Sequence, residues 1–481
     1  DVEDPVVDLF AAETASVLAW TDYFVGNALD TTSKLLRPRI TYEVKRRILD
    51  PIMIAKYNWL KKPDVNNWVP WIMSNCITAS LILEKDEKKR SELVYFAMKN
   101  TDKYINNLGE DGAVNEGPSY WFHAVGCTFD VLDLLESATN GKVSIYKEPI
   151  VQGMASYIYK MHISDNYFIN VADASPQLNP DGLAIFRYGK SVGNEKMMAF
   201  GSWAFHRKKP EALNIRGSNR SRKLFNILAK NECDAYPSEL PKVGDIWFPS
   251  IQLMSARSKG LFVASHGGHN AESHNHNDVG DFIVYAAGYP VIIDVGIGTY
   301  TAKTFSKDRY KIWNNSSGFH NLPIINGAQQ NSGRAAEATE VKYQNSKNAT
   351  SLSMDISSAY PDSVVNSWKR KIELDKKGVL QIIDTYQLPK TKNTIDQVFM
   401  TTCNTQIDKP GRIVFELPNK QTVVLQYNAT DWVATKEKLI LNKQEDPGIV
   451  SNWDGKDIWR LMLTQKTNES SGTATYLINL K

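Results

Sequence analysis

The stretch Trp68–Lys85, WVPWIMSNCITASLILEK, decides the class of the first half of the chain. Its apolar and small residues recur every three or four positions on one stripe, formed by Trp71, Ile72, Cys76, Ala79, Ser80 and Leu83. This period matches the turn of an α-helix, so the stretch is predicted to be a helix with a buried face. Similar spacing, punctuated by helix-ending turns, continues to about Pro241. Residues 1–240 are therefore predicted to form an α-helical domain.

After Trp247 the spacing of the apolar residues changes from the helical period to a period of two, which is typical of strands. The stretch 413–427, IVFELPNKQTVVLQY, contains two short β-rich runs joined by a turn and is typical of a hairpin. Other short β-rich runs follow one another without helices between them, which predicts an antiparallel β-sandwich over residues 241–481. The predicted fold class is therefore multidomain α+β.

The composition excludes several classes of function. The 56 Lys and Arg residues nearly balance the 53 Asp and Glu residues, and a net charge of +3 does not favour a nucleic-acid partner. No run approaches the roughly 18 apolar residues of a membrane span, so we expect a soluble chain. The four cysteines lie far apart and form no recognisable framework. An aromatic content of 10% is compatible with stacking on sugar rings. The composition does not indicate an oligomeric state.

Histidines are concentrated in one part of the second half. Five of the eight fall between positions 266 and 320. His276, Asp294 and His320 supply two imidazoles and a carboxylate, a set of ligands that suits Zn²⁺. The alternative is a group of separate histidines that bond to the backbone.

Three stretches together resemble the heparinase II/III-like polysaccharide lyases, most closely the branches with Asn, Tyr and His at the site. They are Asn66-Asn67-Trp68 through Asn75, then NEGPSYW at 115–121, and AESHNHNDVGDF at 271–282 with the later Asp294, Tyr300 and His320. The resemblance implies an incomplete (α/α) toroid followed by an antiparallel β-sandwich, in agreement with the two periods.

The resemblance also implies a reaction, the β-elimination of a glycosidic bond beside a uronic acid. Asn75 would neutralise the uronate carboxylate through its amide, and Tyr120 would act as general acid, and as base too for a glucuronate. His274 would be the base for an iduronate. Tyr300 is a weaker candidate, with interdomain packing as its alternative. These side chains, from both halves, are expected to meet around one sugar unit.

The remaining implied roles concern the metal and the substrate. The resemblance assigns His276, Asp294 and His320 to a structural zinc ion, for which the sequence identifies no fourth ligand. The predicted substrate contacts are Trp68, Trp71, Glu116, Trp121, His123 and Arg187. Core packing is the alternative for the tryptophans, and ordinary surface charge is the alternative for the arginine.

The preferred interpretation is a lyase acting on an acidic polysaccharide, with glycosaminoglycans as the favoured class. One alternative is an inverting glycoside hydrolase that uses Glu116 with Asp111 or Asp278 as paired carboxylates. Another is a non-catalytic glycan-binding protein on the same scaffold. If the source is bacterial and a signal peptide has been removed, the protein is expected to be periplasmic or secreted.

Overall fold

The computed structural model describes residues 5–54, 57–61, 65–207, 218–389, 392–442, 444 and 446–481. It divides into two compact units. The helical unit comprises Asp1–Val114, Tyr120–Tyr159 and Asn179–Lys242, and the β unit comprises Asn115–Ser119, Lys160–Leu178 and Val243–Lys481. The change from helices to strands therefore falls after Lys242. Two short segments of the first half belong to the β unit, an assignment that the sequence periods did not indicate.

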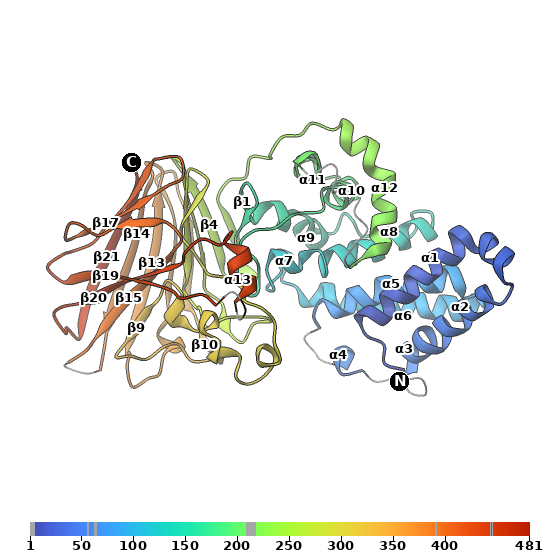
Figure 1. Cartoon of the computed structure of the whole chain (residues 1–481), viewed down its shortest axis with the longest axis horizontal. Helices are drawn as coiled ribbons and strands as arrows, with labels where there is room; N and C mark the ends of the chain where they lie inside the picture. The colour runs from blue at the N-terminus through green and yellow to red at the C-terminus, as the bar shows by residue number, and fades with distance from the viewer. Residues whose placement is uncertain are drawn as a thin grey trace. The chain divides into compact units, whose positions relative to one another are not determined.

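The helical unit is built around α5 (Trp68–Leu83), which packs against α1, α6 and α8 (Figure 1). Almost every residue of α5 is buried, whereas α6 (Glu87–Asn107) buries a single stripe. Asp86 is the N-cap of α6, and its carboxylate accepts a hydrogen bond from Lys89 N. The stripe read from the sequence is thus one face of a fully enclosed helix. The other α-helices named in this region are α1 (Leu9–Thr32), α2 (Leu36–Val44), α3 (Asp50–Ile54), α4 (Asn58–Lys61), α6 (Glu87–Asn107), α7 (Pro118–Trp121), α8 (Val125–Ala138), α9 (Pro149–Lys160), α10 (Gly182–Ser191), α11 (Glu195–Arg207) and α12 (Arg220–Ala235), with a π-helical turn at Lys45–Leu49.

The β unit consists of antiparallel sheets. One sheet has the order β3-β4-β5-β7-β8, with strands Ile246–Phe248, Leu253–Ser258, Leu261–His266, Phe282–Ala286 and Tyr289–Ile292. The largest has the order β11-β12-β13-β14-β21-β18-β17-β16, with strands Thr339–Asn345, Ala349–Asp355, Ser367–Asp375, Val379–Gln387, Ser471–Leu480, Thr422–Gln426, Arg412–Glu416 and Asn404–Gln406. A third has the order β19-β20-β15-β9, with strands Trp432–Lys438, Trp459–Gln465, Ile395–Thr401 and Pro323–Ile325. Two small sheets pair β1 (His162–Ser164) with β2 (Tyr167–Phe168), and β6 (His269–Asn270) with β10 (Gly333–Glu337).

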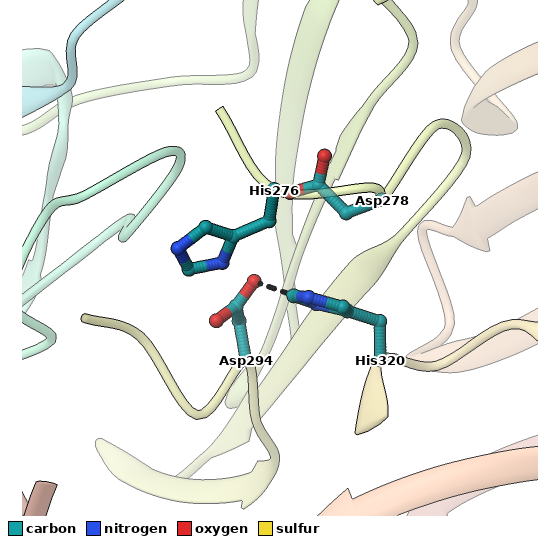
Figure 2. Close-up of side chains that lie close together, drawn as sticks. All are labelled: His276, Asp278, Asp294 and His320. Carbon is teal, nitrogen blue, oxygen red and sulfur yellow. Dashed lines mark ion pairs between the residues drawn. The ribbon is translucent and has the colours of Figure 1, made fainter. Parts of the chain in front are cut away.

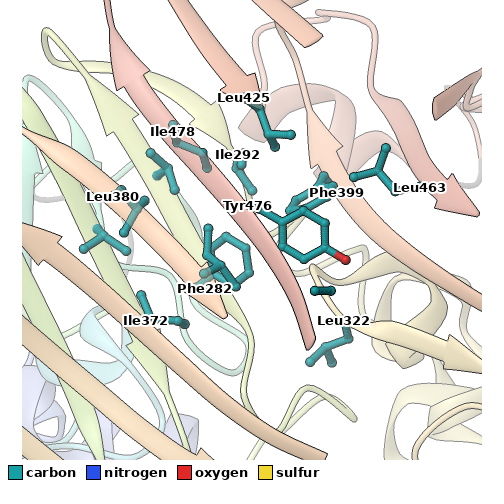
Figure 3. Close-up of a cluster of buried hydrophobic side chains, with 14 of the residues drawn as sticks. Phe282, Ile292, Leu322, Ile372, Leu380, Phe399, Leu425, Leu463, Tyr476 and Ile478 are labelled. Carbon is teal, nitrogen blue, oxygen red and sulfur yellow. The ribbon is translucent and has the colours of Figure 1, made fainter. Parts of the chain in front are cut away.

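Alternation along the strands creates the core of the sandwich. In β14, Leu380 and Ile382 are fully buried, while their neighbours are more exposed, as expected for a period of two. Both belong to one buried hydrophobic cluster, and Figure 3 shows Leu380 within it together with side chains from other strands, including Phe282, Phe399 and Tyr476. The hairpin predicted at 413–427 is formed by β17 and β18, with Val414 opposite Val424.

Short helices interrupt the β unit, so the expectation of strands without helices between them was wrong. Between β8 and β9 the chain forms 3-10 turns at Ala302–Phe305, Arg309–Lys311, Trp313–Asn315 and Ser317–Phe319, and α13 (Pro447–Asn452) precedes β20. A hydroxyl-based cap at Thr301 and Thr304 starts the first turn, a local signal with no hydrophobic period. The four cysteines are buried and form no disulfide bonds. None of the described helices is long and apolar enough to cross a membrane.

Candidate functional site

Asp173 lies at the centre of a polar group in the β unit, although it comes from the first half of the sequence. Its Oδ2 lies 2.9 Å from His274 Nδ1 and accepts a hydrogen bond of 2.9 Å from the Tyr300 hydroxyl. Its Oδ1 lies 3.3 Å from His276 Nε2 and accepts a hydrogen bond of 2.6 Å from Arg309 Nη2. One carboxylate, 1% exposed, therefore contacts two imidazoles, a phenol and a guanidinium.

The Asp173 carboxylate stays ionised in this setting. Burial alone would raise its pKa, but hydrogen bonds from His274 and His276, together with the charge of Arg309, outweigh burial and hold the pKa well below its usual range. An ionised carboxylate favours the His274 tautomer in which Nδ1–H donates a hydrogen bond to Asp173 Oδ2, and in that tautomer the lone pair is on Nε2. This tautomer is the one that a general base requires.

The backbone at His274 is held in an unusual conformation. Its φ of +61° lies in the left-handed region, which few residues other than glycine adopt. Arg309 stabilises this turn, because its Nη2 donates to His274 O at 2.8 Å and its Nε donates to Asn275 O at 3.0 Å. Strain of this kind persists where the surrounding contacts fix it, and it is often found at functional sites.

Tyr300 joins His274 in this group. Its hydroxyl lies 3.2 Å from His274 Nδ1, and the residue is 39% exposed. A phenol beside an imidazole can take part in proton transfer, because both groups can donate or accept a proton. The weaker of the two tyrosines considered from the sequence is therefore the one that the β unit places beside His274.

Glu116 contacts the loop that carries His274. Its Oε1 accepts a hydrogen bond of 3.0 Å from Ser273 Oγ and lies 3.9 Å from His274 Nε2. The next residue, Gly117, has a φ of +83°, and a Cβ there would lie 2.6 Å from Val171 O, so only glycine fits. Glu116 thus supports the loop, and its predicted contact with substrate stays a prediction.

A second group lies beside the first and could hold a metal ion. One ligand atom from each of His276, Asp278, Asp294 and His320 can be chosen so that all four lie within 4.8 Å of one another, and all four residues are buried. Figure 2 shows the two imidazoles and the Asp294 carboxylate facing a common centre, with Asp294 Oδ2 3.2 Å from His320 Nδ1. Asp278 is a candidate for the fourth ligand, which the sequence did not identify.

The chemistry of this cluster fits a cation. Among the described residues, no hydrogen-bond partner is found for the buried His276 Nδ1 or for His320 Nε2. Burial raises the pKa of Asp278 to about 6 even though nearby histidines oppose the rise. Burial would also raise the pKa of Asp294, but the charge and hydrogen bond of His320 outweigh it and lower the value. Two carboxylates and ring nitrogens without hydrogen-bond partners, all buried and close together, could hold a metal ion.

The helical unit contains the other two predicted catalytic residues. Asn75 lies in the middle of α5 and donates one amide hydrogen to Trp71 O at 2.8 Å. Tyr120 lies in the short helix α7, where its carbonyl accepts from His123 N at 2.9 Å. Because these residues belong to a different unit from His274, their predicted joint action on one sugar stays a prediction.

The predicted aromatic contacts are of two kinds. Trp71 stacks on His123 with ring centroids 4.5 Å apart, and Asn219 Nδ2 lies 3.0 Å from His123 Nδ1. Burial, reinforced by the charge of Arg222, lowers the pKa of His123 to about 4, so this imidazole is neutral near neutral pH. Trp68, at the start of α5, is partly buried.

Trp121 is a core residue, which corrects its prediction as a sugar contact. The ring is 0% exposed, and its Nε1 donates to Met154 O at 2.9 Å within the helical unit. Stacking on a sugar needs an accessible ring face, which Trp121 lacks.

Arg187 also differs from its prediction as a receptor for substrate anions. Its guanidinium, 13% exposed, forms ion pairs with Asp130 at 3.0 Å and Asp133 at 3.3 Å. It also stacks on Phe225. Two carboxylates already compensate its charge, so Arg187 stabilises the packing of helices.

The residues of the hydrolase alternative have other partners. Asp111 Oδ1 accepts a hydrogen bond of 3.0 Å from Ala113 N and thus caps a turn in the helical unit. Asp278 lies in the cluster with His276, Asp294 and His320 that could hold a metal ion. Glu116 accepts a hydrogen bond from Ser273 in the loop that carries His274. The geometry therefore accounts for these carboxylates without a hydrolytic pair.

Sequence reasoning missed Asp173 and Arg309. Asp173 is 101 positions from His274, and no periodic pattern links the two. Arg309 lies in a 3-10 turn without a recognisable spacing. Asp278 could have been found, because it lies two positions after His276 in the stretch that carries the resemblance.

Comparison with known proteins supports the fold. Residues 251–465 match the family model described as Heparinase II/III-like, C-terminal, which confirms the resemblance drawn from the sequence. No curated protein matches the chain. Among solved structures, the chain is similar to Heparinase III, with 13% identity and a TM-score of 0.72 over 98% of this chain and 68% of that one. It is also similar to heparan sulfate lyase HepC from Pedobacter heparinus, with 14% identity and a TM-score of 0.67 over 98% and 67%.

A more distant similarity is to the chondroitin AC lyase of Streptomyces coelicolor A3, solved in complex with chondroitin sulphate. The identity is 9% and the TM-score 0.60, over 97% of this chain and 66% of that one. The chain thus spans about two thirds of the length of these proteins. At such identities the similarity establishes the fold, and the predicted class, a helical toroid followed by an antiparallel β-sandwich, is confirmed.

Proposed function

We propose that this protein is a polysaccharide lyase that cleaves acidic, uronate-containing polysaccharides, most favourably glycosaminoglycans, by β-elimination. The observation that carries the proposal is the group formed by His274, Asp173 and Tyr300. It sets an imidazole, oriented by an ionised carboxylate, beside a partly exposed phenol. The similarity in fold to known lyases supports the same function.

The reaction needs a base and an acid on one sugar. The base takes the C5 proton of the uronate, a double bond forms between C4 and C5, and the C4–O bond breaks. The departing oxygen keeps the bonding electron pair and receives a proton from the acid. His274, with its lone pair on Nε2, is assigned to the proton abstraction, and Tyr300 is a second group that can exchange a proton there.

The uronate carboxylate also has to be neutralised, because a negative charge next to C5 makes its proton harder to remove. The amide of Asn75 is proposed for this task and the phenol of Tyr120 for protonation of the leaving oxygen. Each rests on the residue type and on the sequence resemblance. Substitution of either one should therefore lower turnover as strongly as substitution of His274.

The cluster of His276, Asp278, Asp294 and His320 is proposed to bind a structural Zn²⁺. Four protein ligands leave no open position for a reacting water, so the ion would hold the loop between β6 and β7 in place. Protein purified without chelator should contain about one zinc per chain. A preparation with intact fold and no bound metal would refute this assignment.

The decisive test is an absorbance assay of the purified protein with hyaluronan, chondroitin, dermatan, heparan, heparin, alginate and ulvan. Elimination leaves a conjugated, unsaturated uronate that absorbs in the ultraviolet, whereas hydrolysis does not. Tyr300→Phe should reduce the rate by roughly 100-fold or more. Tyr343→Phe is the matched control, because Tyr343 stacks on Trp247 in the same unit and has no place in the site.

Other outcomes would favour other functions. New reducing ends without ultraviolet absorbance would indicate the hydrolase, and binding without any product would indicate the glycan-binding protein. The proposal includes export to the periplasm or the medium, where such polymers are found. Recovery of the protein only from the cytoplasmic fraction of its source cells would contradict that part.

A further inference from the structure

Asp173 is the carboxylate shared by the proton-transfer group and the metal cluster. Its two oxygens have different partners. Oδ2 contacts His274 Nδ1 and the Tyr300 hydroxyl, while Oδ1 contacts His276 Nε2 and Arg309. Asp173 lies within 3.3 Å of both histidines, whereas Glu116 Oε1 lies 3.9 Å from His274 Nε2.

The contact with His276 determines which of its ring nitrogens faces the metal cluster. Nε2 lies 3.3 Å from Asp173 Oδ1. Nδ1 is buried without a hydrogen-bond partner among the described residues, and Figure 2 shows one ring nitrogen directed toward Asp294 and His320. A histidine that ligates a metal commonly donates its other N–H to a carboxylate, which fixes both the tautomer and the ring orientation.

The contact of Asp173 Oδ2 with His274 fixes the tautomer of that imidazole in the same way. A proton on Nδ1, donated to Asp173, leaves the lone pair on Nε2. Arg309 completes the arrangement, because it neutralises Asp173 and also bonds the backbone oxygens of residues 274 and 275. The Asp173 carboxylate is thus buried, and its charge is neutralised by Arg309. It cannot turn toward another partner without breaking several hydrogen bonds.

We propose that Asp173 is a positioning residue that holds two histidines at once, His274 with Nε2 available as base and His276 with Nδ1 directed to the metal. The first half of this inference rests on the proposed lyase function, and the second half rests only on zinc binding. It predicts that the metal cluster and the base respond together to a single substitution.

The test compares wild type with Asp173→Asn, which keeps the size of the side chain but removes its charge and one acceptor. The matched control is Asp245→Asn, because Asp245 is also a largely buried carboxylate of the β unit, paired with Lys376 and away from the cluster. Zinc affinity is measured by competition with a chelator of known affinity. Asp173→Asn should weaken zinc binding by roughly 10- to 100-fold, and the control should not.

Steady-state kinetics test the proposed role of Asp173 toward His274. On the polymer that wild type cleaves, Asp173→Asn should lower kcat by roughly 10- to 100-fold with little change in KM, because the base is disoriented while the contacts to sugar remain. If wild type cleaves no polymer, the lyase function fails, while the zinc measurement still decides the role toward His276. If wild type is active and the variant keeps both its kcat and its zinc affinity, the inference fails and the lyase function stands.

A second measurement, which does not use Asp173→Asn, covers the case in which that variant does not fold. Zinc-loaded wild-type protein labelled with ¹⁵N-histidine should show one ligating histidine bound through Nδ1 with a protonated Nε2, assigned to His276 by its loss in His276→Ala. A cluster in which His276 binds through Nε2, or wild-type protein that binds no zinc, would overturn the role of Asp173 toward the metal.

Discussion

Removal of the Arg370 guanidinium should destabilise the β unit strongly. Arg370 lies in β13 and is 0% exposed, as is its partner Asp384 in β14. Its Nε and Nη2 donate to the two oxygens of Asp384 at 2.8 and 2.7 Å, and Nη2 also donates to Gln397 Oε1 at 2.9 Å. Nη1 donates to Gly280 O at 3.0 Å and to Asn321 O at 2.9 Å. The guanidinium thus joins β13 to β14 and β15, and to the two loops that carry the candidate metal ligands.

The magnitude follows from what Arg370→Met leaves behind. Asp384 would keep a buried charge without its bidentate partner, a change that costs about 3 to 5 kcal/mol in comparable buried pairs. The backbone oxygens of Gly280 and Asn321 lose a donor, which places the expected loss of unfolding free energy at the upper end of that range. Arg370→Met/Asp384→Leu removes both charges, so it should recover at least about 2 kcal/mol relative to the single substitution.

Hydrogen exchange of peptides from β13 and β14, followed by mass spectrometry, reports the opening free energy of the β unit separately from the helical unit. Zinc affinity should fall in Arg370→Met as well, because Gly280 and Asn321 lie within two positions of Asp278 and His320. A single substitution that changes the opening free energy by less than about 1 kcal/mol, or a double substitution that is worse than the single one, would refute the reasoning.

Three further outcomes are expected. Tyr120→Phe should lower turnover by roughly 100-fold or more, as expected for a lost general acid, with stability near wild type; the exposed Tyr95, changed to Phe, is its control, and an unaltered rate would remove the role of Tyr120. His274→Ala should reduce cleavage beside iduronate more than beside glucuronate, and equal losses would show that it is not a linkage-specific base. The partly buried His123 has a pKa of about 4, below the roughly 6.5 of an unfolded chain, so the unfolded state binds more protons as the pH falls through that window and stability declines. His123→Gln should therefore show a smaller fall in Tm between pH 7 and pH 5 than wild type, and an equal fall would contradict the assignment.

The two domains could be read from the sequence because the period of the hydrophobic pattern is a local property. Trp71 and Leu83 mark the stripe of α5, and Leu380 and Ile382 alternate with less buried neighbours in β14. Less regular segments were not predictable in this way. The turns between β8 and β9 have no hydrophobic period, and Arg309, which lies there, gave no signal.

The residues of the candidate site could also be predicted only in part. His274, His276, Asp294 and His320 could be chosen by residue type and by resemblance, and the structure brings three of them together with Asp278. The two misassigned contacts, Trp121 and Arg187, failed because neither burial nor ion pairing can be read from residue type.

The sequence by itself determined the order of helices and strands and the candidate histidines, since both follow from neighbours along the chain. Only the tertiary structure decided that Asp173 lies between His274 and His276, 101 and 103 positions away. Contacts over such separations depend on how packed segments close long loops, and that closure leaves no mark in the local pattern of residues.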